Sequence, residues 1–227
     1  GTWSDDTSLV LATCDSIRGK GRIDPNDMQQ RFNNWLFEGV YTPDGLTFDV
    51  GNATREALTR GHGLSDEYSN GNGSLMRILP LAFTEASPSD IEAVSSITHA
   101  HATSVEACQL YVDIASRLLK GQQLPEILSG IETSKTYARL QTLAELTEDD
   151  IRSTGYVVDT LEAALWCLLT STSYLETVLK AVNLGDDTDT VAAVAGGLAG
   201  IIYGLEGIPD KWLAQLRHKE LLESCLF

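Results

Sequence analysis

The sequence predicts an all-α fold, since apolar residues recur at helical spacing, few segments alternate as strands do, and glycines and prolines punctuate the helical stretches. The clearest apolar stripe consists of Val191, Val194, Leu198, Ile201, Ile202 and Leu205. Spacings of three and four residues place such side chains on one helix face, which we expect to be buried. A chain of 227 residues with 43% hydrophobic content can bury a full core, so we expect one domain over residues 1–227.

Further helices are predicted by the same periodicity along the chain. In order, the helical segments contain residues 5–17, 55–58, 75–79, 108–119, 161–169 and 191–205. The polar region 133–155 has the weakest pattern, and its apolar residues are Tyr137, Leu140, Leu143 and Leu146. We interpret this region as a helical segment and a candidate mobile flap.

Composition excludes several classes of function. Sixteen Lys and Arg against 32 Asp and Glu give a formal charge of −16, which would repel a nucleic-acid backbone, so general nucleic-acid binding is not expected. The longest apolar stretch, 191–205, falls short of the roughly 20 residues that cross a bilayer, so no membrane segment is expected. Four widely separated cysteines and the absence of a secretory leader favour the cytoplasm.

The first candidate site lies at the start of the first predicted helix, where Ser4, Asp5 and Asp6 supply three side-chain oxygens. Ser and Asp at such positions satisfy free backbone amides and complement the helix dipole without any metal. The same oxygens could also bind a cation. This motif alone leaves a helix cap and a functional site both open.

A second acidic cluster, Asp186, Asp187 and Asp189, precedes the most hydrophobic helix. Three carboxylates within four residues repel one another unless a cation lies between them, and a helix cap requires only one. Oxygen ligands from Asp and Thr190 favour Mg²⁺ or Mn²⁺. Zinc is not expected, because the closely spaced histidines stand two residues apart rather than four.

Two glycine-containing turns separate these clusters. Asp49 stands in a turn that enters a helix, which it could simply cap. Gly71, Asn72, Gly73 and Ser74 precede the next helix, where free backbone amides can hold a phosphate. Such tripeptides also occur in ordinary turns, so this signal is weak.

Five motifs in this order resemble the ADP-ribosylglycohydrolase family, in particular its bacterial branch typified by dinitrogenase reductase activating glycohydrolase. The motifs are Trp-Ser-Asp-Asp-Thr at 3–7, Phe-Asp-Val-Gly-Asn-Ala-Thr at 48–54, Gly-Asn-Gly-Ser-Leu-Met-Arg at 71–77, Thr-His-Ala-His at 98–101 and Gly-Asp-Asp-Thr-Asp-Thr at 185–190. Together they span nearly the whole chain. Family members usually begin with a further amino-terminal segment, and its absence here predicts a truncated form or an incomplete site.

The resemblance implies an orthogonal multi-helix bundle with a dinuclear metal centre in a cleft that receives ADP-ribose. It implies that two divalent cations, Mg²⁺ or Mn²⁺, are bound by Ser4, Asp5, Asp6, Asp187, Asp189 and Thr190. Asp189 would bridge both ions, and Asp49 would be the catalytic carboxylate. The implied substrate-binding residues are Gly71, Asn72, Gly73, Ser74 and His99. Arg77 matches its motif, but it could equally brace the bundle.

By the same resemblance we expect a cytoplasmic, metal-dependent hydrolase that removes ADP-ribose from a modified protein side chain, arginine first, or from a related small ADP-ribosyl conjugate. The alternative is a catalytically impaired ADP-ribose-binding or structural relative. A terpene-synthase-like enzyme would also be all-α with facing aspartate motifs. It is disfavoured because its aspartate spacing is absent and only 7% of residues are aromatic.

Overall fold

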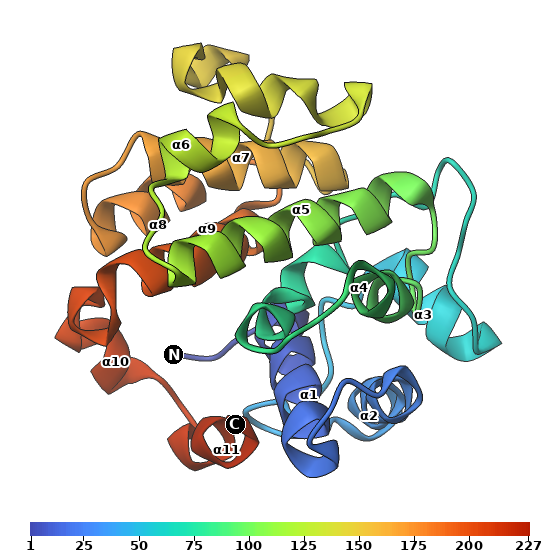
Figure 1. Ribbon diagram of the computed structural model, residues 1–227. Coiled ribbons are helices and arrows are strands. Elements are labelled where there is room, and N and C mark those ends of the chain that lie inside the picture. The colour runs from blue at the N-terminus through green and yellow to red at the C-terminus, as the bar shows by residue number, and fades with distance from the viewer.

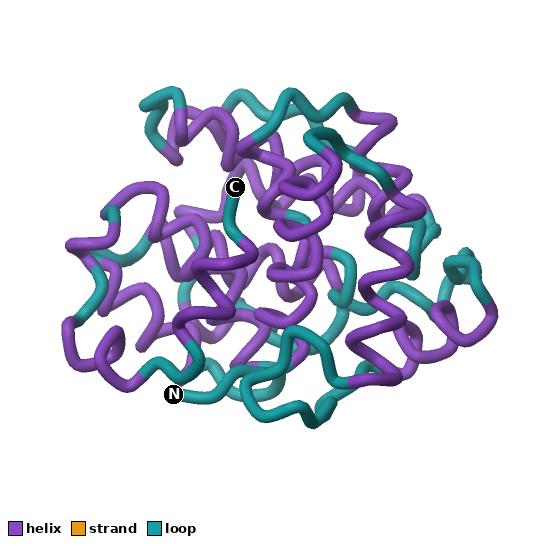
Figure 2. Tube along the Cα trace, turned by 90° about the horizontal axis from the view of Figure 1, so that it is seen from below, coloured by secondary structure: helices purple, strands orange, loops and turns teal.

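The computed structural model describes residues 1–227, and its regular elements are all helices (Figures 1 and 2). The α-helices are α1 (Asp5–Lys20), α2 (Pro25–Glu38), α3 (Asn52–Arg60), α4 (Pro88–Ser95), α5 (Ala102–Leu119), α6 (Leu124–Ser129), α7 (Val157–Leu169), α8 (Tyr174–Asn183), α9 (Thr188–Tyr203), α10 (Asp210–Gln215) and α11 (Lys219–Cys225). Short 3₁₀ helices lie at Leu75–Arg77, Leu79–Phe83, Lys135–Glu145, Glu148–Asp150 and Leu205–Gly207. The all-α prediction is confirmed.

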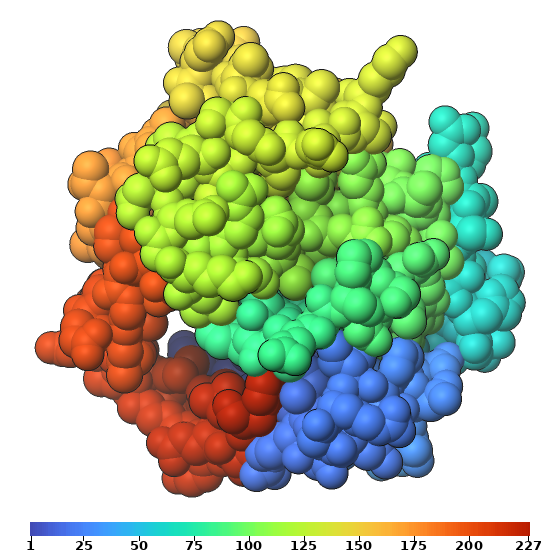
Figure 3. Space-filling model, in the orientation of Figure 1, coloured from blue at the N-terminus to red at the C-terminus, as the bar shows by residue number.

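The helices run in more than one direction. Helices α5, α7 and α9 pack against one another, and Figure 1 shows α1 crossing them steeply. Helix α2 packs on α1, and α8 packs on α9. The first and last segments of the chain lie side by side (Figure 3), because α11 contacts α1 and the Arg217 amide donates to the Gly1 carbonyl at 3.0 Å. This arrangement brings the start of α1 close to the start of α9.

Local sequence signals set the ends of the first helices. Gly21 ends α1 in a left-handed conformation, φ 64°, which glycine adopts without strain. Asp24 caps α2, accepting from the Asp27 amide at 3.2 Å, and Pro25 occupies the first helical position, where no amide hydrogen is needed. These signals fix where α1 ends and where α2 begins.

One hydrophobic cluster of 50 buried residues joins the helices. The predicted stripe at 191–205 contributes Val191, Val194 and Leu198 to it. The prediction was wrong for the end of that stripe, because Ile202 is 43% exposed and Leu205 is 65% exposed. Helix α9 stops at Tyr203, and the chain there leaves the core toward α10. No helix combines the length and apolarity that crossing a bilayer would require.

The region 133–155 forms 3₁₀ helices where the sequence suggested an ordinary helical segment. Its apolar residues at steps of three, Tyr137, Leu140 and Leu143, are fully buried. The Tyr137 hydroxyl donates to the Thr103 carbonyl at 2.8 Å, and the Trp166 indole donates to the Leu146 carbonyl at 3.0 Å. These contacts hold the candidate flap against α5 and α7.

A second difference concerns the segment after the Gly71–Ser74 turn. The sequence predicted a helix through Leu79, but the structure has two short 3₁₀ helices, Leu75–Arg77 and Leu79–Phe83. Pro80, in the second one, lacks the amide hydrogen that a continuous α-helix would use. A three-residue 3₁₀ helix has little dipole, so any phosphate binding here depends on the turn itself.

Candidate functional site

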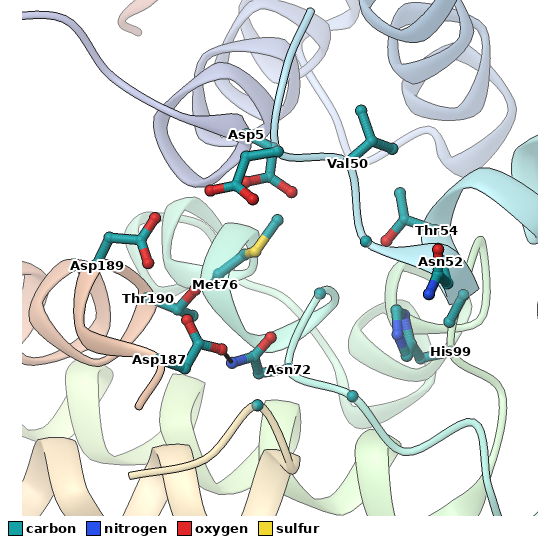
Figure 4. Close-up of a pocket in the computed structure, with 16 residues that line it drawn as sticks. Asp5, Val50, Asn52, Thr54, Asn72, Met76, His99, Asp187, Asp189 and Thr190 are labelled. Carbon is teal, nitrogen blue, oxygen red and sulfur yellow. Dashed lines mark hydrogen bonds between the residues drawn. The ribbon is translucent and has the colours of Figure 1, made fainter. Parts of the chain in front are cut away.

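A cavity of about 320 Å³ opens where the first turns of α1 and α9 meet. Its wall is made by Asp5, Asp49, Val50, Gly51, Asn52, Ala53, Thr54, Gly71, Asn72, Gly73, Met76, His99, Gly155, Asp187, Asp189 and Thr190. Figure 4 shows Asp5 on one side, with Asp187, Asp189 and Thr190 facing it from the other. Residues from all five sequence motifs therefore share one cavity or its immediate surroundings.

Ser4 precedes α1, yet its hydroxyl does not cap that helix. It donates to Asp6 Oδ2 at 2.8 Å and lies 3.2 Å from Asp189 Oδ2, so it links the first helix to α9. Asp5 and Asp6 are buried, at 7% and 3% exposure. Capping by the Ser4 side chain is therefore wrong, because its hydroxyl faces the last long helix, whereas Asp5 and Asp6 do lie in the first turn of α1, where they complement the helix dipole.

The buried carboxylates are held in an environment that disfavours their charge. Burial, followed by the charges of Asp6 and Asp49, raises the pKa of Asp5 from 3.8 to about 8. Burial also raises the pKa of Asp6 to about 6, although the hydrogen bond from Ser4 opposes it and the charge of Asp189 adds to it. A cation at this place would reverse both effects.

The second cluster is shaped by a tight turn before α9. Gly185 and Asp186 both have left-handed backbones, φ 94° and 53°. Asp187 stands at the N-cap of α9 without capping it; its Oδ2 accepts instead from Asn72 Nδ2 at 2.8 Å. Asn72 Nδ2 also donates to Thr160 Oγ1 at 2.9 Å, and Thr160 is buried in α7. Asn72 thereby fixes the orientation of the Asp187 carboxylate, whose pKa burial raises.

The donor atoms around α1 and α9 fit a hard divalent cation. They are carboxylate and hydroxyl oxygens, the ligands that Mg²⁺ and Mn²⁺ prefer. Asp6 Oδ1 is buried without any hydrogen-bond partner in the protein, so this oxygen has a free lone pair with which it could bind a cation. No three His, Cys, Asp or Glu side chains stand close enough together to form a complete metal site by themselves. Ser4, which contacts Asp6 and Asp189, and Thr190, which lines the cavity, add hydroxyl oxygens to the candidate ligand set.

Asp49 lies on the cavity wall rather than at a helix cap. The N-cap of α3 is Gly51, and no side chain caps that helix. Asp49 is exposed and has a left-handed backbone, φ 56°, which costs energy for a residue other than glycine. The capping interpretation of Asp49 is wrong, and its carboxylate remains free to act at the cavity.

The Gly71–Ser74 turn forms the wall beside His99. A Cβ atom on Gly73 would lie 2.8 Å from Thr54 Oγ1 and 2.9 Å from His99 Cε1, so only glycine fits there. Ser74 does not line the cavity. Its hydroxyl is fully buried and accepts from Ser95 Oγ at 3.1 Å, so the predicted role of Ser74 in substrate binding stays a prediction for its backbone rather than its side chain.

The two histidines of the Thr-His-Ala-His motif have different environments. His99 is 1% exposed and lines the cavity, and burial, with the charge of Arg77, lowers its pKa to about 3. His101 instead caps α5, where Nδ1 accepts from the Thr103 amide at 3.2 Å. The two imidazoles therefore have separate hydrogen-bond partners.

One residue that lines the cavity, Gly155, lies outside the five sequence motifs and was not predicted. Gly155 lines the cavity, its carbonyl accepts from the Asn72 amide at 3.1 Å, and a Cβ there would lie 3.1 Å from Asp187 Oδ2. It is the last residue of the weakly patterned region 133–155 and shortly precedes α7. The turn signal of a glycine directly before an apolar helix was available, but nothing in it pointed to Asp187.

Comparisons with known proteins match one family along the chain. The family model described as ADP-ribosylglycohydrolase matches residues 1–226. ADP-ribosylarginine hydrolase Tri1 of Pseudomonas putida (strain GB-1) is 37% identical over 246 residues, covering 100% of this chain and 66% of the relative. The ADP-ribosyl-[dinitrogen reductase] glycohydrolase of Rhodospirillum rubrum is 31% identical over 236 residues, covering 96% of this chain and 75% of the relative.

A solved structure titled "ADP-ribosylglycohydrolase-related protein complex" superposes with a TM-score of 0.80 at 31% identity, covering 98% of this chain and 79% of that one. The chain spans 66% of the length of the Tri1 relatives from Pseudomonas putida and Serratia proteamaculans (strain 568). The family match over almost every residue and these relatives lead to one conclusion. The chain belongs to the ADP-ribosylglycohydrolase family.

Proposed function

We propose that this chain is a divalent-metal-dependent hydrolase that removes ADP-ribose from a modified protein side chain, with arginine as the first candidate. The observation that carries the proposal is the meeting, in one cavity, of the buried Asp5 of α1 with Asp187 and Asp189 at the start of α9, beside the exposed Asp49. The choice of arginine is supported by the name of the Tri1 relatives. Four free cysteines support a reducing, cytoplasmic location as part of the same proposal.

The residues that would hold two divalent cations, Mg²⁺ or Mn²⁺, are Ser4, Asp5, Asp6, Asp187, Asp189 and Thr190, and Asp189 would be a ligand of both. When bound, such cations polarise oxygen atoms and lower the pKa of water. The chain's own contribution is orientation: Ser4 holds Asp6, and Asn72 holds Asp187. These hydrogen bonds keep both carboxylates turned toward the space between α1 and α9.

Hydrolysis of a ribosyl bond passes through a state with positive charge on the anomeric carbon and needs a group that moves a proton. We assign that role to the Asp49 carboxylate, which lines the cavity without any hydrogen bond to the protein. The turn residues Gly71, Asn72 and Gly73, together with His99, would hold ADP-ribose on the opposite wall. Small residues at 71 and 73 leave room for a ligand to approach the backbone.

The experiment is incubation of the purified protein with an ADP-ribosylated arginine peptide and Mn²⁺, with released ADP-ribose as the readout. Release that stops on addition of a chelator supports the proposal. A protein that binds ADP-ribose without releasing it from any of a panel of arginine, serine and small-molecule conjugates would instead be the catalytically impaired relative. That result would contradict the proposed hydrolysis.

A further inference from the structure

A fully buried arginine stands behind the candidate substrate wall. Arg77 is 0% exposed, its guanidinium lies 4.7 Å from the centre of the Phe32 ring, and no carboxylate forms an ion pair with it. Its Nη1 donates to the Gly73 carbonyl, and its Nη2 donates to Thr98 Oγ1 at 2.8 Å. A buried charge is costly, so a site that retains one without a counter-charge calls for an explanation.

The hydroxyl of Thr98 connects this arginine to His99. Thr98 is fully buried, and its Oγ1 lies 2.8 Å from His99 Nδ1. The hydroxyl carries one hydrogen, and one of its lone pairs already accepts from Arg77. If His99 carried its hydrogen on Nδ1, the Thr98 hydrogen would have no acceptor in a buried place. The hydroxyl therefore donates to Nδ1, and the imidazole hydrogen stays on Nε2.

Thr98 and Arg77 also oppose the protonation of both ring nitrogens of His99. An imidazolium would have to donate Nδ1–H to Thr98 Oγ1, which would leave the Thr98 hydrogen without an acceptor, and it would stand beside the guanidinium of Arg77. On the other side of the ring, Nε2 forms no hydrogen bond within the protein and faces the glycine wall of the cavity. A Cβ atom on Gly71 or Gly73 would lie 3.6 or 3.5 Å from it. A donor at Nε2 is thus open to a ligand.

We propose that Arg77 and Thr98 are positioning residues that hold His99 as the neutral tautomer with its hydrogen on Nε2, so that His99 donates to an acceptor oxygen of the ligand. The same guanidinium donates to the Gly73 carbonyl, so Arg77 helps to position both the Gly71–Ser74 turn and the Nε2–H donor of His99. The proposal rests on the proposed function only for the identity of that ligand. The tautomer itself follows from the protein alone.

The first experiment needs no ligand. Nitrogen-15 NMR of the imidazole rings reports which nitrogen carries hydrogen, and the signal of His99 among the four histidines is assigned by its loss in His99→Gln. We expect a single neutral tautomer, hydrogen on Nε2, unchanged from about pH 5 to about pH 8. A hydrogen on Nδ1, or a titration within that range, would overturn the proposal even if ADP-ribose never binds.

The second experiment compares Thr98→Val, which keeps the shape but removes the hydroxyl, with Thr98→Ser, which keeps the hydroxyl. We expect Thr98→Val to lose the single tautomer and to raise the Kd for ADP-ribose and the KM on the order of 10-fold, with kcat little changed. Thr98→Ser should match the parent protein. If Thr98→Val keeps the tautomer and the parent Kd, the proposed positioning of His99 by Thr98 is contradicted. If the parent itself does not bind ADP-ribose, only the proposed function fails.

Discussion

Replacing Asp5 by Asn should stabilise the metal-free protein at alkaline pH. The folded protein holds the pKa of Asp5 at about 8, against 3.8 for the ordinary carboxyl. The folded state binds this proton more tightly than the unfolded state does. The free energy of unfolding therefore falls as the pH rises from the pKa of Asp5 in the unfolded chain toward its pKa in the folded protein, and the whole loss is present above about pH 8. An amide at this position carries no charge, so its burial does not depend on pH.

The magnitude follows from the shift. Between about pH 5 and about pH 8 the carboxyl of Asp5 would cost at most about 4 kcal/mol, at 1.36 kcal/mol per pH unit over about three units. Entry of water into the cavity and relaxation of the neighbouring carboxylates reduce this cost. We therefore expect the change in the free energy of unfolding caused by Asp5→Asn to be about 1–3 kcal/mol more favourable at about pH 8 than at about pH 5.

Urea unfolding in the presence of a chelator, at both pH values, measures this difference directly. The parent protein should lose stability between the two pH values, and Asp5→Asn should lose clearly less. Asp113→Asn is the matched control, because that carboxylate is exposed on α5 away from the cavity. If the free energy of unfolding depended on pH equally in the parent and in Asp5→Asn, the claim that the charged form of Asp5 destabilises the folded protein would be refuted.

Three further substitutions test other parts of the site. Asp49→Asn should lower turnover about 100-fold while leaving ADP-ribose affinity and the urea midpoint unchanged, as steady-state kinetics and calorimetry would show. Gly73→Ala should raise KM, because the new methyl group would displace His99, whereas Gly200→Ala, with open space around it, should leave KM unchanged. Asn72→Ala should weaken Mn²⁺ binding roughly 10-fold in a titration, since Asp187 then loses the hydrogen bond that orients it.

The sequence predicted the all-α class because long helices such as α5 and α9 have a periodic apolar stripe, which can be recognised without knowing what each helix packs against. It did not predict the 3₁₀ helix at Lys135–Glu145, although Tyr137, Leu140 and Leu143 recur at steps of three, the period of that helix. A step of three also belongs to the α-helical pattern. Short 3₁₀ segments are therefore poorly separated from α-helices by periodicity alone.

The motifs predicted which residues belong to the candidate site, but not the contacts between them. Residues 4–6 and 187–190 meet because α1 and α9 pack together, which no local pattern specifies. Whether Ser4 caps its helix or contacts Asp189 depends on that packing, so the sequence alone left both open. Gly155 and Thr160 were missed because their partner, the turn at Asn72, lies far away in the chain. Such contacts exist only in the folded state.

The central claim is that carboxylates from the first and last long helices bind the same divalent cations. Calorimetric titration of Mn²⁺ into chelator-treated protein tests it most directly, with the parent, Asp6→Asn and Asp189→Asn measured side by side. We predict uptake of about two ions per chain by the parent and loss of that uptake in both variants, although they lie on different helices. Normal uptake by either variant, or none by the parent, would contradict the claim.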